Sequence, residues 1–410
     1  MAALVKFTKA GALRVPERLA SAFVVKRHQA TQPTDINLTN YKRGTGGRSS
    51  FSGLVVTVFG CKGTLGYNLA NRLGKIGSQV IIPYRGEPSE VRDLKLMGDL
   101  GQILFNPIEL RDEDSIRKVC QYSSVVINCI GKEYETLNYT YDDVHNKGAR
   151  LIARIAQESG VQRLIHVSAL NAGHRSDGKY RPGGSQWLIS KGEGEESVKG
   201  EFPNATIIRP AEFIDTNDYF TTYYLGRGRY IRRFRPFRQG THYPKVIPLH
   251  NNGEAIRMPV LVRDVSMGII AAMRDPSTAG KTYQCVGPHA YKLGDLVKFM
   301  VACHGQKFKV ESGYGNLINR VAFREKVYHT LKFPYPKCTL DKLERETVSD
   351  CLDPSLPTLE DLGVTPENIE DTIYFLLRSY ADPSGIFSDH IRARKPPTPD
   401  IIFDTLQTQH

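Results

Sequence analysis

The stretch that most constrains the fold is VVTVFGCKGTLGYNLANRL, residues 55–73. A β-branched apolar run ends at Gly60, and Gly63 and Gly66 follow at intervals of three before an apolar pattern of helical period begins. This order predicts a strand, a tight loop and a helix. Without side chains, the loop backbone can approach a pyrophosphate, which binds the N–H groups at the positive end of a helix. A glycine-rich turn that holds no ligand is the alternative interpretation.

The length of the chain predicts more than one domain. Its 410 residues exceed what one ordinary core holds, so we expect a nucleotide-binding domain and a second, smaller one. The most apolar segment, residues 258–273, contains Arg263 and Asp264 and is too short to span a bilayer. The seven cysteines lack the paired spacing of metal ligands, which predicts no metal site and favours a reducing compartment.

The first thirty residues have the composition of a mitochondrial presequence. They carry six cations and one acid, Glu17, among dispersed Leu, Val and Phe, with Ala and Ser as filler. The apolar residues are too scattered for a secretory signal, and a disordered basic tail is the alternative. Residues 31–53 are rich in Gly, Ser and Arg and predict an irregular segment before the first strand.

From residue 54 onward, apolar strands alternate with amphipathic helices. Strands are predicted at the start of this region and within 79–85, 102–112, 123–131, 163–172 and 202–215, with helices at 67–75, 113–120 and 142–161. Such repeats predict an α/β fold with a doubly wound parallel sheet over residues 54–225. The buried side of the helix at 142–161 is predicted to carry Val144, Ala149, Ile152, Ile155 and Ala156.

Two strand ends suggest which nucleotide is bound. An NAD-specific site places Asp or Glu after the second strand, but this chain has Tyr84 and Arg85, and a cation there favours the 2′-phosphate of NADP. Lys62 in the glycine loop adds a positive charge or is an ordinary solvated lysine. Asn128 and Gly131 end the fourth strand, at the edge where ligands bind in open α/β sheets.

Taken together, these motifs resemble a known superfamily. The glycine triplet, the strand ends INCIG and HVSALNA, the helix DDVHNKGARLIARIA and the later TIIRPAEF are similar to the extended and atypical short-chain dehydrogenase/reductases. A narrower resemblance covers about residues 40–286 through NYKRGTGGRSSFSG, FGCKGTLGYNLANRLGKIGSQVIIPYRG and NPIELRDEDSI. These segments resemble the alpha-subcomplex subunit 9 family, the nucleotide-binding accessory subunits of mitochondrial respiratory complex I. The resemblance is thinner in the last hundred residues.

The superfamily provides a test for catalysis. Its active members use a Tyr-x-x-x-Lys helix, in which the lysine lowers the tyrosine pKa and binds the ribose, while a serine holds the substrate carbonyl. Here Ser168 follows the fifth strand and Lys191 lies in SQWLISKGEGEE, but the residue four before Lys191 is Trp187. An indole cannot exchange a proton near neutral pH, and Tyr180 is separated from this helix by RPGG. We therefore predict no catalytic residue, unless Trp187 is a core aromatic unrelated to the motif.

The family resemblance implies a function without turnover. It implies NADPH held as a structural cofactor by a noncatalytic subunit, with other complex I subunits as partners, on the matrix side of the inner membrane where the peripheral and membrane arms meet. The alternative is a mitochondrial NADP-dependent reductase of an unknown carbonyl substrate. The predicted cofactor-binding residues are Gly60, Lys62, Gly63, Thr64, Leu65, Gly66, Arg85, Asn128, Ile130, Gly131, Ser168 and Lys191.

Residues 226–390 are predicted to form the smaller, mainly helical part. Its returning helix should bury Val265, Ile269 and Met273 ahead of a closing strand, and residues 391–410 should form an extended tail, either a docking arm or a frayed end. It opens with a predicted basic loop at 226–245 that suits anionic inner-membrane lipid or an acidic partner surface. RNA and a plain solvated loop are the alternatives, and we predict no nucleic-acid partner because no RNA-binding module is recognisable. The loop arginines are Arg227, Arg229, Arg232, Arg233, Arg235 and Arg238.

Overall fold

The computed structural model describes residues 52–216, 218–232, 245–303, 308–331, 338–378 and 396–405. All of these residues belong to one compact unit, which spans residues 38–410. The predicted presequence and nearly all of the irregular segment lie outside the described residues. The same holds for residues 233–244 of the predicted basic loop.

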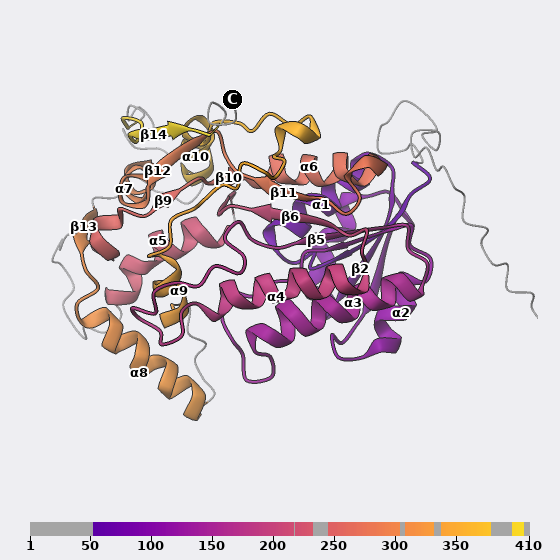
Figure 1. Cartoon of the computed structure of the whole chain (residues 1–410), viewed down its shortest axis with the longest axis horizontal. Helices are drawn as coiled ribbons and strands as arrows, with labels where there is room; N and C mark the ends of the chain where they lie inside the picture. The colour runs from indigo at the N-terminus through magenta and orange to yellow at the C-terminus, as the bar shows by residue number, and fades with distance from the viewer. Residues whose placement is uncertain are drawn as a thin grey trace, which may run out of the picture. The chain divides into compact units, whose positions relative to one another are not determined.

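A seven-stranded parallel sheet forms the centre of the fold (Figure 1). The strand order β11-β6-β5-β4-β1-β2-β3 reverses between β1 and β4, which is where ligands bind in doubly wound sheets. The predicted fold class is confirmed. The strands of this sheet are β1 (Val55–Phe59), β2 (Gln79–Tyr84), β3 (Ile103–Pro107), β4 (Val125–Asn128), β5 (Arg163–Val167), β6 (Thr206–Pro210) and β11 (Thr282–Cys285).

Helices cover both faces of the sheet because each buries an apolar side against it. One core contains side chains of α1, η3 and α6, and the other contains side chains of α2, α3 and α4. Val265, Ile269 and Met273 of α6 are fully buried, which confirms the predicted returning helix. The bounds are α1 (Thr64–Lys75), η3 (Pro88–Met97), α2 (Glu113–Cys120), α3 (Gly148–Glu158), α4 (Gln186–Glu201) and α6 (Val262–Arg274).

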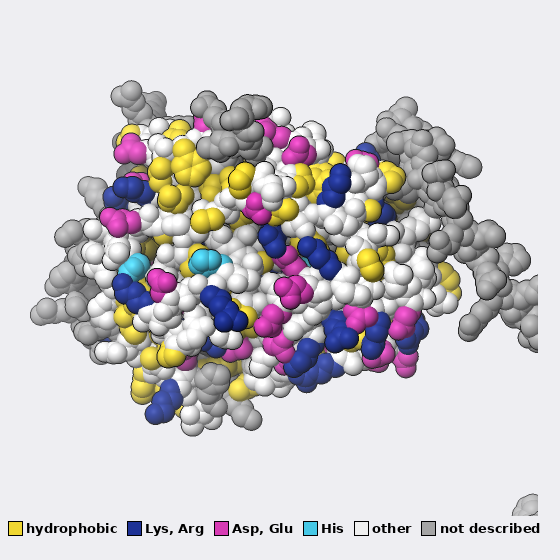
Figure 2. Space-filling view, viewed as in Figure 1, with side chains coloured by type: hydrophobic (Ala, Val, Ile, Leu, Met, Phe, Trp, Pro, Cys, Tyr) yellow, Lys and Arg dark blue, Asp and Glu magenta, His cyan; other side chains and the backbone are white. Residues whose placement is uncertain are grey.

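The helix predicted at 142–161 begins with a π-helical turn, η4 (Asp143–Lys147), and continues as α3. All five side chains predicted on its inner side are buried. The outer surfaces of α2, α3 and α4 carry cations and acids side by side (Figure 2). Arg117 pairs with Glu158 at 2.8 Å and Arg154 pairs with Glu113, as expected for a surface in contact with water.

The part predicted to be mainly helical contains helices α7, α8 and α10 after residue 288, but it also contains strands that the sequence did not predict. β8 pairs with β13, and β12 lies between β9 and β14. The described part of the tail contains β14, which pairs with β12 of the same chain. Residues 226–232 were predicted in a loop, but they continue helix α5. The bounds are β7 (Phe213–Ile214), α5 (Tyr219–Arg232), β8 (Lys245–Leu249), η5 (His250–Gly253), β9 (Ile256–Arg257), β10 (Val260–Leu261), η6 (Pro276–Thr278), β12 (His289–Lys292), α7 (Leu293–Cys303), β13 (Phe308–Ser312), α8 (Asn316–Leu331), α9 (Leu340–Arg345), η7 (Glu360–Leu362), α10 (Ile369–Arg378) and β14 (Ile401–Asp404).

The unpredicted strands pair with segments far away in the chain, so local periodicity does not reveal them. Within the described residues, no helix combines the length and apolar character needed to cross a bilayer. The proposed domain boundaries at residues 225 and 390 stay predictions.

Candidate nucleotide-binding site

The glycine loop after β1 packs against the end of β4. Gly60 has a φ of +86°, and a Cβ on it would lie 2.8 Å from the carbonyl oxygen of Cys129. Gly66, in the first turn of α1, leaves room for the loop because a Cβ there would lie 2.4 Å from the Gly60 oxygen. The Gly63 N–H donates to that same oxygen at 3.0 Å. The loop therefore lies at the strand-order reversal and needs glycine at two positions.

The positive end of α1 lies at this edge of the sheet. Gly63 is the N-cap residue, no side chain caps the helix, and its first turn, which begins with Thr64 and Leu65, contains no acid. A helix end of this kind favours an anion. Lys62 beside it is exposed and pairs with Glu90 of η3, so part of its charge is already neutralised.

The chain following β4 is held by three side chains. The Asn128 amide oxygen accepts from the Ile130 N–H at 3.0 Å. His145 Nε2 accepts from the Lys132 N–H at 3.1 Å, and Trp187 Nε1 donates to the Lys132 oxygen at 2.7 Å. The backbone that ends the fourth strand is thus fixed on both sides of Lys132.

Lys191 and Ser168 lie next to this strand end. Lys191 Nζ donates to the Val167 oxygen at 3.3 Å and lies 3.5 Å from where a Cβ on Gly131 would be. Burial lowers the pKa of Lys191 to about 8. The Ser168 hydroxyl is buried and makes no hydrogen bond to the described residues. A lysine bonded to the Val167 oxygen and the unsatisfied hydroxyl of the next residue in the chain, Ser168, are groups that a ribose would need.

Trp187, which the motif resemblance predicts at the tyrosine position, has side chains of α4 and α9 and the His145 ring as neighbours. It lies one helical turn before Lys191 on α4, and its indole N–H donates to the Lys132 oxygen. The Arg345 guanidinium lies 4.2 Å from the ring centroid, and the His145 ring meets the indole edge-on. The indole provides neither a hydroxyl nor an acidic proton.

A cluster of cations surrounds Tyr139 at the ends of β2, β3 and β4. The centroid of this buried ring lies 5.1 Å from the Arg85 guanidinium, 4.5 Å from that of Arg111 and 5.7 Å from Lys132 Nζ. Burial and the neighbouring Arg85 charge lower the pKa of Lys132. Cations gathered in this way favour an anion such as a phosphate, although Arg111 Nη2 also lies 3.5 Å from an Asp143 carboxylate oxygen and the Glu109 carboxylate accepts from the Tyr139 hydroxyl. The sequence identified Arg85 alone, although Arg111 and Lys132 also follow carboxyl ends of strands.

Comparisons with known proteins show which family the chain belongs to. A family model described as NAD(P)H-binding matches residues 60–231. The mouse mitochondrial protein NADH dehydrogenase (ubiquinone) 1 alpha subcomplex subunit 9 is 39% identical over 404 residues, covering 97% of this chain and 98% of that protein. The chain belongs to the subunit 9 family. The subunit 9 protein of Arabidopsis thaliana is 36% identical over 361 residues, covering 87% of this chain and 85% of its own.

A solved structure extends the comparison to the fold of the subunit 9 family. Triphenylmethane reductase from Citrobacter sp. matches with a TM-score of 0.56 at 14% identity, covering 79% of this chain and 99% of its own. At that identity the likeness concerns the fold alone. This subunit 9 family member therefore shares the α/β fold of that solved structure.

Ten of the twelve predicted residues fall into two groups in this subunit 9 family member. Gly60, Gly63, Thr64, Leu65 and Gly66 form the loop and helix end, while Asn128, Ile130, Gly131, Ser168 and Lys191 gather where β4, β5 and α4 meet. The close approach of the Gly60 backbone to the end of β4 and the unsatisfied Ser168 hydroxyl both fit a dinucleotide. Arg85 lies apart, on the β2 side of β1, with the cations around Tyr139.

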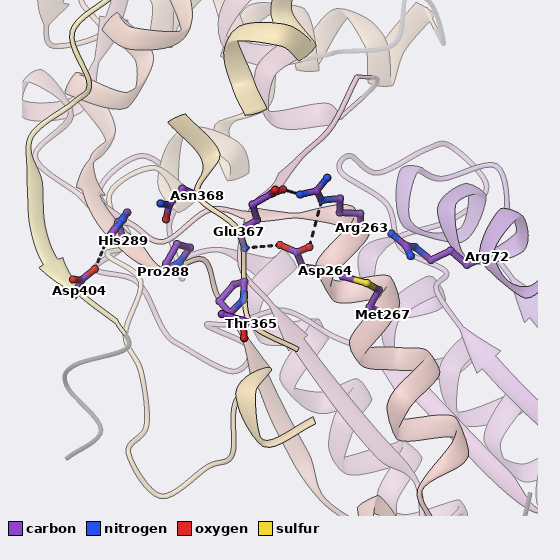
Figure 3. A pocket seen from close by; sticks show the side chains of 11 residues that line it. Arg72, Arg263, Asp264, Met267, Pro288, His289, Thr365, Glu367, Asn368 and Asp404 are labelled. Carbon is purple, nitrogen blue, oxygen red and sulfur yellow. Dashed lines mark hydrogen bonds and ion pairs between the residues drawn. The ribbon is translucent and has the colours of Figure 1, made fainter. Parts of the chain in front are cut away.

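A cavity of about 720 Å³ lies elsewhere, between α1, α6 and β14 (Figure 3). Arg263 pairs with Glu367 on its wall, and Asp264 accepts from the Glu367 N–H at 2.9 Å. None of the predicted site residues lines this cavity. This cavity is therefore separate from the predicted nucleotide contacts in the glycine loop and at the strand ends.

Proposed function

We propose that this protein is a noncatalytic accessory subunit of mitochondrial complex I that binds NADPH as a structural cofactor. It supports assembly and stability at the junction of the peripheral and membrane arms, on the matrix side of the inner membrane, with other complex I subunits as partners. One arrangement carries this proposal. The glycine loop packs closely against the end of β4, while Trp187, four residues before Lys191, has its indole N–H bonded to the Lys132 oxygen. Membership of the subunit 9 family supports the assembly role.

The cation cluster around Tyr139 supports NADPH as the nucleotide. Arg85, Arg111 and Lys132 would bind the 2′-phosphate, while the glycine loop and the start of α1 would bind the pyrophosphate. Ser168 and Lys191 would bind the ribose beside the nicotinamide. NADPH can donate a hydride in an enzyme. In this chain the bound nucleotide would instead hold together the ends of β1, β2 and β4 through the residues that bind it.

A reductase is the second candidate, because Ser168 and Lys191 of the catalytic set are present. Such an enzyme would transfer the hydride of NADPH to a carbonyl substrate. It would show turnover in the native chain and would not need Trp187→Tyr. A structural subunit would instead purify with one nucleotide per chain, release it slowly and migrate in a large membrane complex.

For the segment at 227–238 we propose contact with anionic inner-membrane lipid or an acidic partner surface. Its arginine and aromatic composition supports this, since arginine pairs with phosphate and aromatic rings favour the membrane interface. Neutralising Arg229, Arg232, Arg233 and Arg235 together should weaken attachment of the subunit at moderate salt. Unchanged assembly would favour a solvated segment.

Arg85→Ala tests whether NADPH is the structural nucleotide. We expect NADPH binding to weaken about ten- to hundredfold, because one charge-assisted contact is lost, while NADH binding changes little. Dissociation constants for both nucleotides measure this. Lys62→Ala is the matched comparison, and we expect a smaller effect because Glu90 pairs with that ammonium.

The same variants also test the assembly role in cells. When Arg85→Ala or Gly66→Val replaces the native protein, we expect lower complex I content on native gels, because the empty site loses the stabilisation from bound ligand. Mass and absorbance of the nucleotide retained by the purified complex report occupancy. Normal complex abundance with an empty site would show that the nucleotide is not structural.

A further inference from the structure

Helix α9 is a six-residue helix, LDKLER, whose charged residues are all buried. Asp341 and Glu344 are inaccessible to solvent, and Lys342 and Arg345 are nearly so. Charged side chains are rarely buried unless they are paired, so the surroundings of α9 must supply partners. Figure 1 shows α9 beside the beginning of α4, the helix that carries Trp187 and Lys191.

The two carboxylates of α9 bind the start of α4 and the chain before it. Asp341 accepts from the Gln186 N–H at 2.8 Å and from the Ser185 hydroxyl at 3.0 Å. Glu344 accepts from the backbone N–H groups of Gly178 and Tyr180 at 2.8 and 2.6 Å. α9 therefore supplies the anions that this helix start requires.

Arg345 connects α9 to the chain that follows β4. Its Nη2 donates to Glu133 Oε2 at 2.7 Å while its guanidinium covers the Trp187 ring. Its Nε also lies 3.6 Å from a carboxylate oxygen of Asp341. Glu133 comes two residues after Gly131, so the Arg345–Glu133 contact lies close in the chain to Gly131, a predicted nucleotide contact.

The third side of α9 reaches the end of β6. Lys342 Nζ lies 2.9 Å from Glu212 Oε1, just after that strand, and the guanidinium of Arg257 donates to the Arg345 oxygen at 2.9 Å. α9 thus bridges the ends of β4, α4 and β6. In a reductase of this fold, the carbonyl substrate occupies the space beside the tyrosine position at these strand ends.

We propose that α9 fills the space that a carbonyl substrate occupies in a reductase of this fold. Arg345, through its contacts with Glu133 and Trp187, then couples the position of α9 to nucleotide bound at Gly131. The inference rests on the proposed NADPH binding. Nucleotide that orders the chain after β4 also orders the Arg345 contact, so binding stabilises residues 338–350, far along the chain. The C-terminal part then depends on an occupied site, and the Arg345 guanidinium, 4.2 Å from the Trp187 ring centroid, fills space that a carbonyl substrate would need.

Hydrogen exchange on the full chain, with and without saturating NADPH, tests this coupling. We expect NADPH to slow exchange about tenfold or more both in residues 60–66 and in residues 338–350. In Arg345→Met, protection by NADPH should remain at 60–66 and be largely lost at 338–350. Arg274→Met, at an exposed position at the end of α6, is the matched control and should behave like the native chain. Glu133→Gln keeps the shape of the contact and should reduce the coupling even if Arg345→Met does not fold.

The outcomes separate the two proposals. Protection at 60–66 with none at 338–350 in the native chain would overturn the coupling alone. Equal coupling in the native chain and in both coupling variants would also overturn it. No protection at 60–66 would overturn the proposed NADPH function, and the coupling with it.

Discussion

Lys191 shows how burial alters a single residue of this site. Its ammonium is enclosed between β5 and α4 and donates to one carbonyl, that of Val167. Loss of hydration lowers the pKa of Lys191 to about 8, and the more distant carboxylates of Glu133 and Glu195 offset this only in part. A buried cation of this kind costs stability until a ligand contacts it.

Lys191→Met should stabilise the nucleotide-free chain in a pH-dependent way. Below pH 8 the Lys191 ammonium is charged in both the folded and the unfolded chain. Its burial then lowers the free energy of unfolding of the native protein by the full amount, up to about 3 kcal/mol. As the pH rises from about 8 to about 10.5, the folded chain loses its proton first and the advantage of the variant shrinks. Urea unfolding at pH 7 and pH 10 measures this. Lys199→Met, exposed on the same helix, is the control, and parallel pH profiles for native and Lys191→Met would contradict the argument.

At the scale of elements, α4 is positioned by close backbone contacts. A Cβ on Gly194 would lie 2.1 Å from the His145 oxygen, and one on Gly192 would lie 2.5 Å from the α-carbon of Gly173. These contacts explain why SQWLISKGEGEESVKGE lacks the apolar stripe of an ordinary core helix. They also place Trp187 and Lys191 close to the ends of β4 and β5.

Gly194→Ala should therefore destabilise the protein, although alanine is the better helix former. The added methyl group overlaps backbone, which forces a shift that costs about 1–3 kcal/mol. Gly200→Ala is a matched control on the same helix, because nothing lies within 4 Å of its added Cβ. That change should be neutral or stabilise by up to about 1 kcal/mol. Denaturant unfolding compares the two, and equal stability of Gly194→Ala and the native chain would refute the close-packing argument.

At the scale of the whole described chain, late segments complete the early sheet. β11 pairs with β6, and Ser266 of α6 donates to the Asn68 side chain of α1 at 2.8 Å. The Arg163 guanidinium of β5 donates to the backbone oxygens of Ala272 and Pro276 at 2.9 and 3.1 Å. The region matched by the NAD(P)H-binding family model therefore requires residues beyond its end.

A chain that ends at residue 231 should not unfold cooperatively. It lacks Val265, Ile269 and Met273, three fully buried side chains worth about 1.5–3 kcal/mol each, which together approach the whole stability of an ordinary domain. A chain ending at residue 378 keeps α6 and β11 and should show a single thermal transition. Calorimetry distinguishes the two, and a sharp transition in the shorter chain would contradict the prediction.

Much of the sheet could be read from local pattern. The helix predicted at 113–120 matches α2 residue for residue, and the strand, glycine loop and helix at 55–73 lie where expected. Such features depend on neighbours in sequence, namely apolar period, helix caps and glycine spacing. The place after the second strand selected Arg85 as a predicted contact, and the superfamily motif selected Lys191.

What local pattern could not reveal are the contacts between distant segments. Arg345 against Trp187, the cations around Tyr139 and the pairing of β8 with β13 join residues that no period connects. The helix LDKLER has the composition of a solvent-exposed segment, and it is buried only because the ends of β4, α4 and β6 converge to pair its charges. The sequence thus determines the nucleotide-binding scaffold, while the packing of the C-terminal chain decides what fills the space beside it, since burial and charge pairing exist only once the chain has folded.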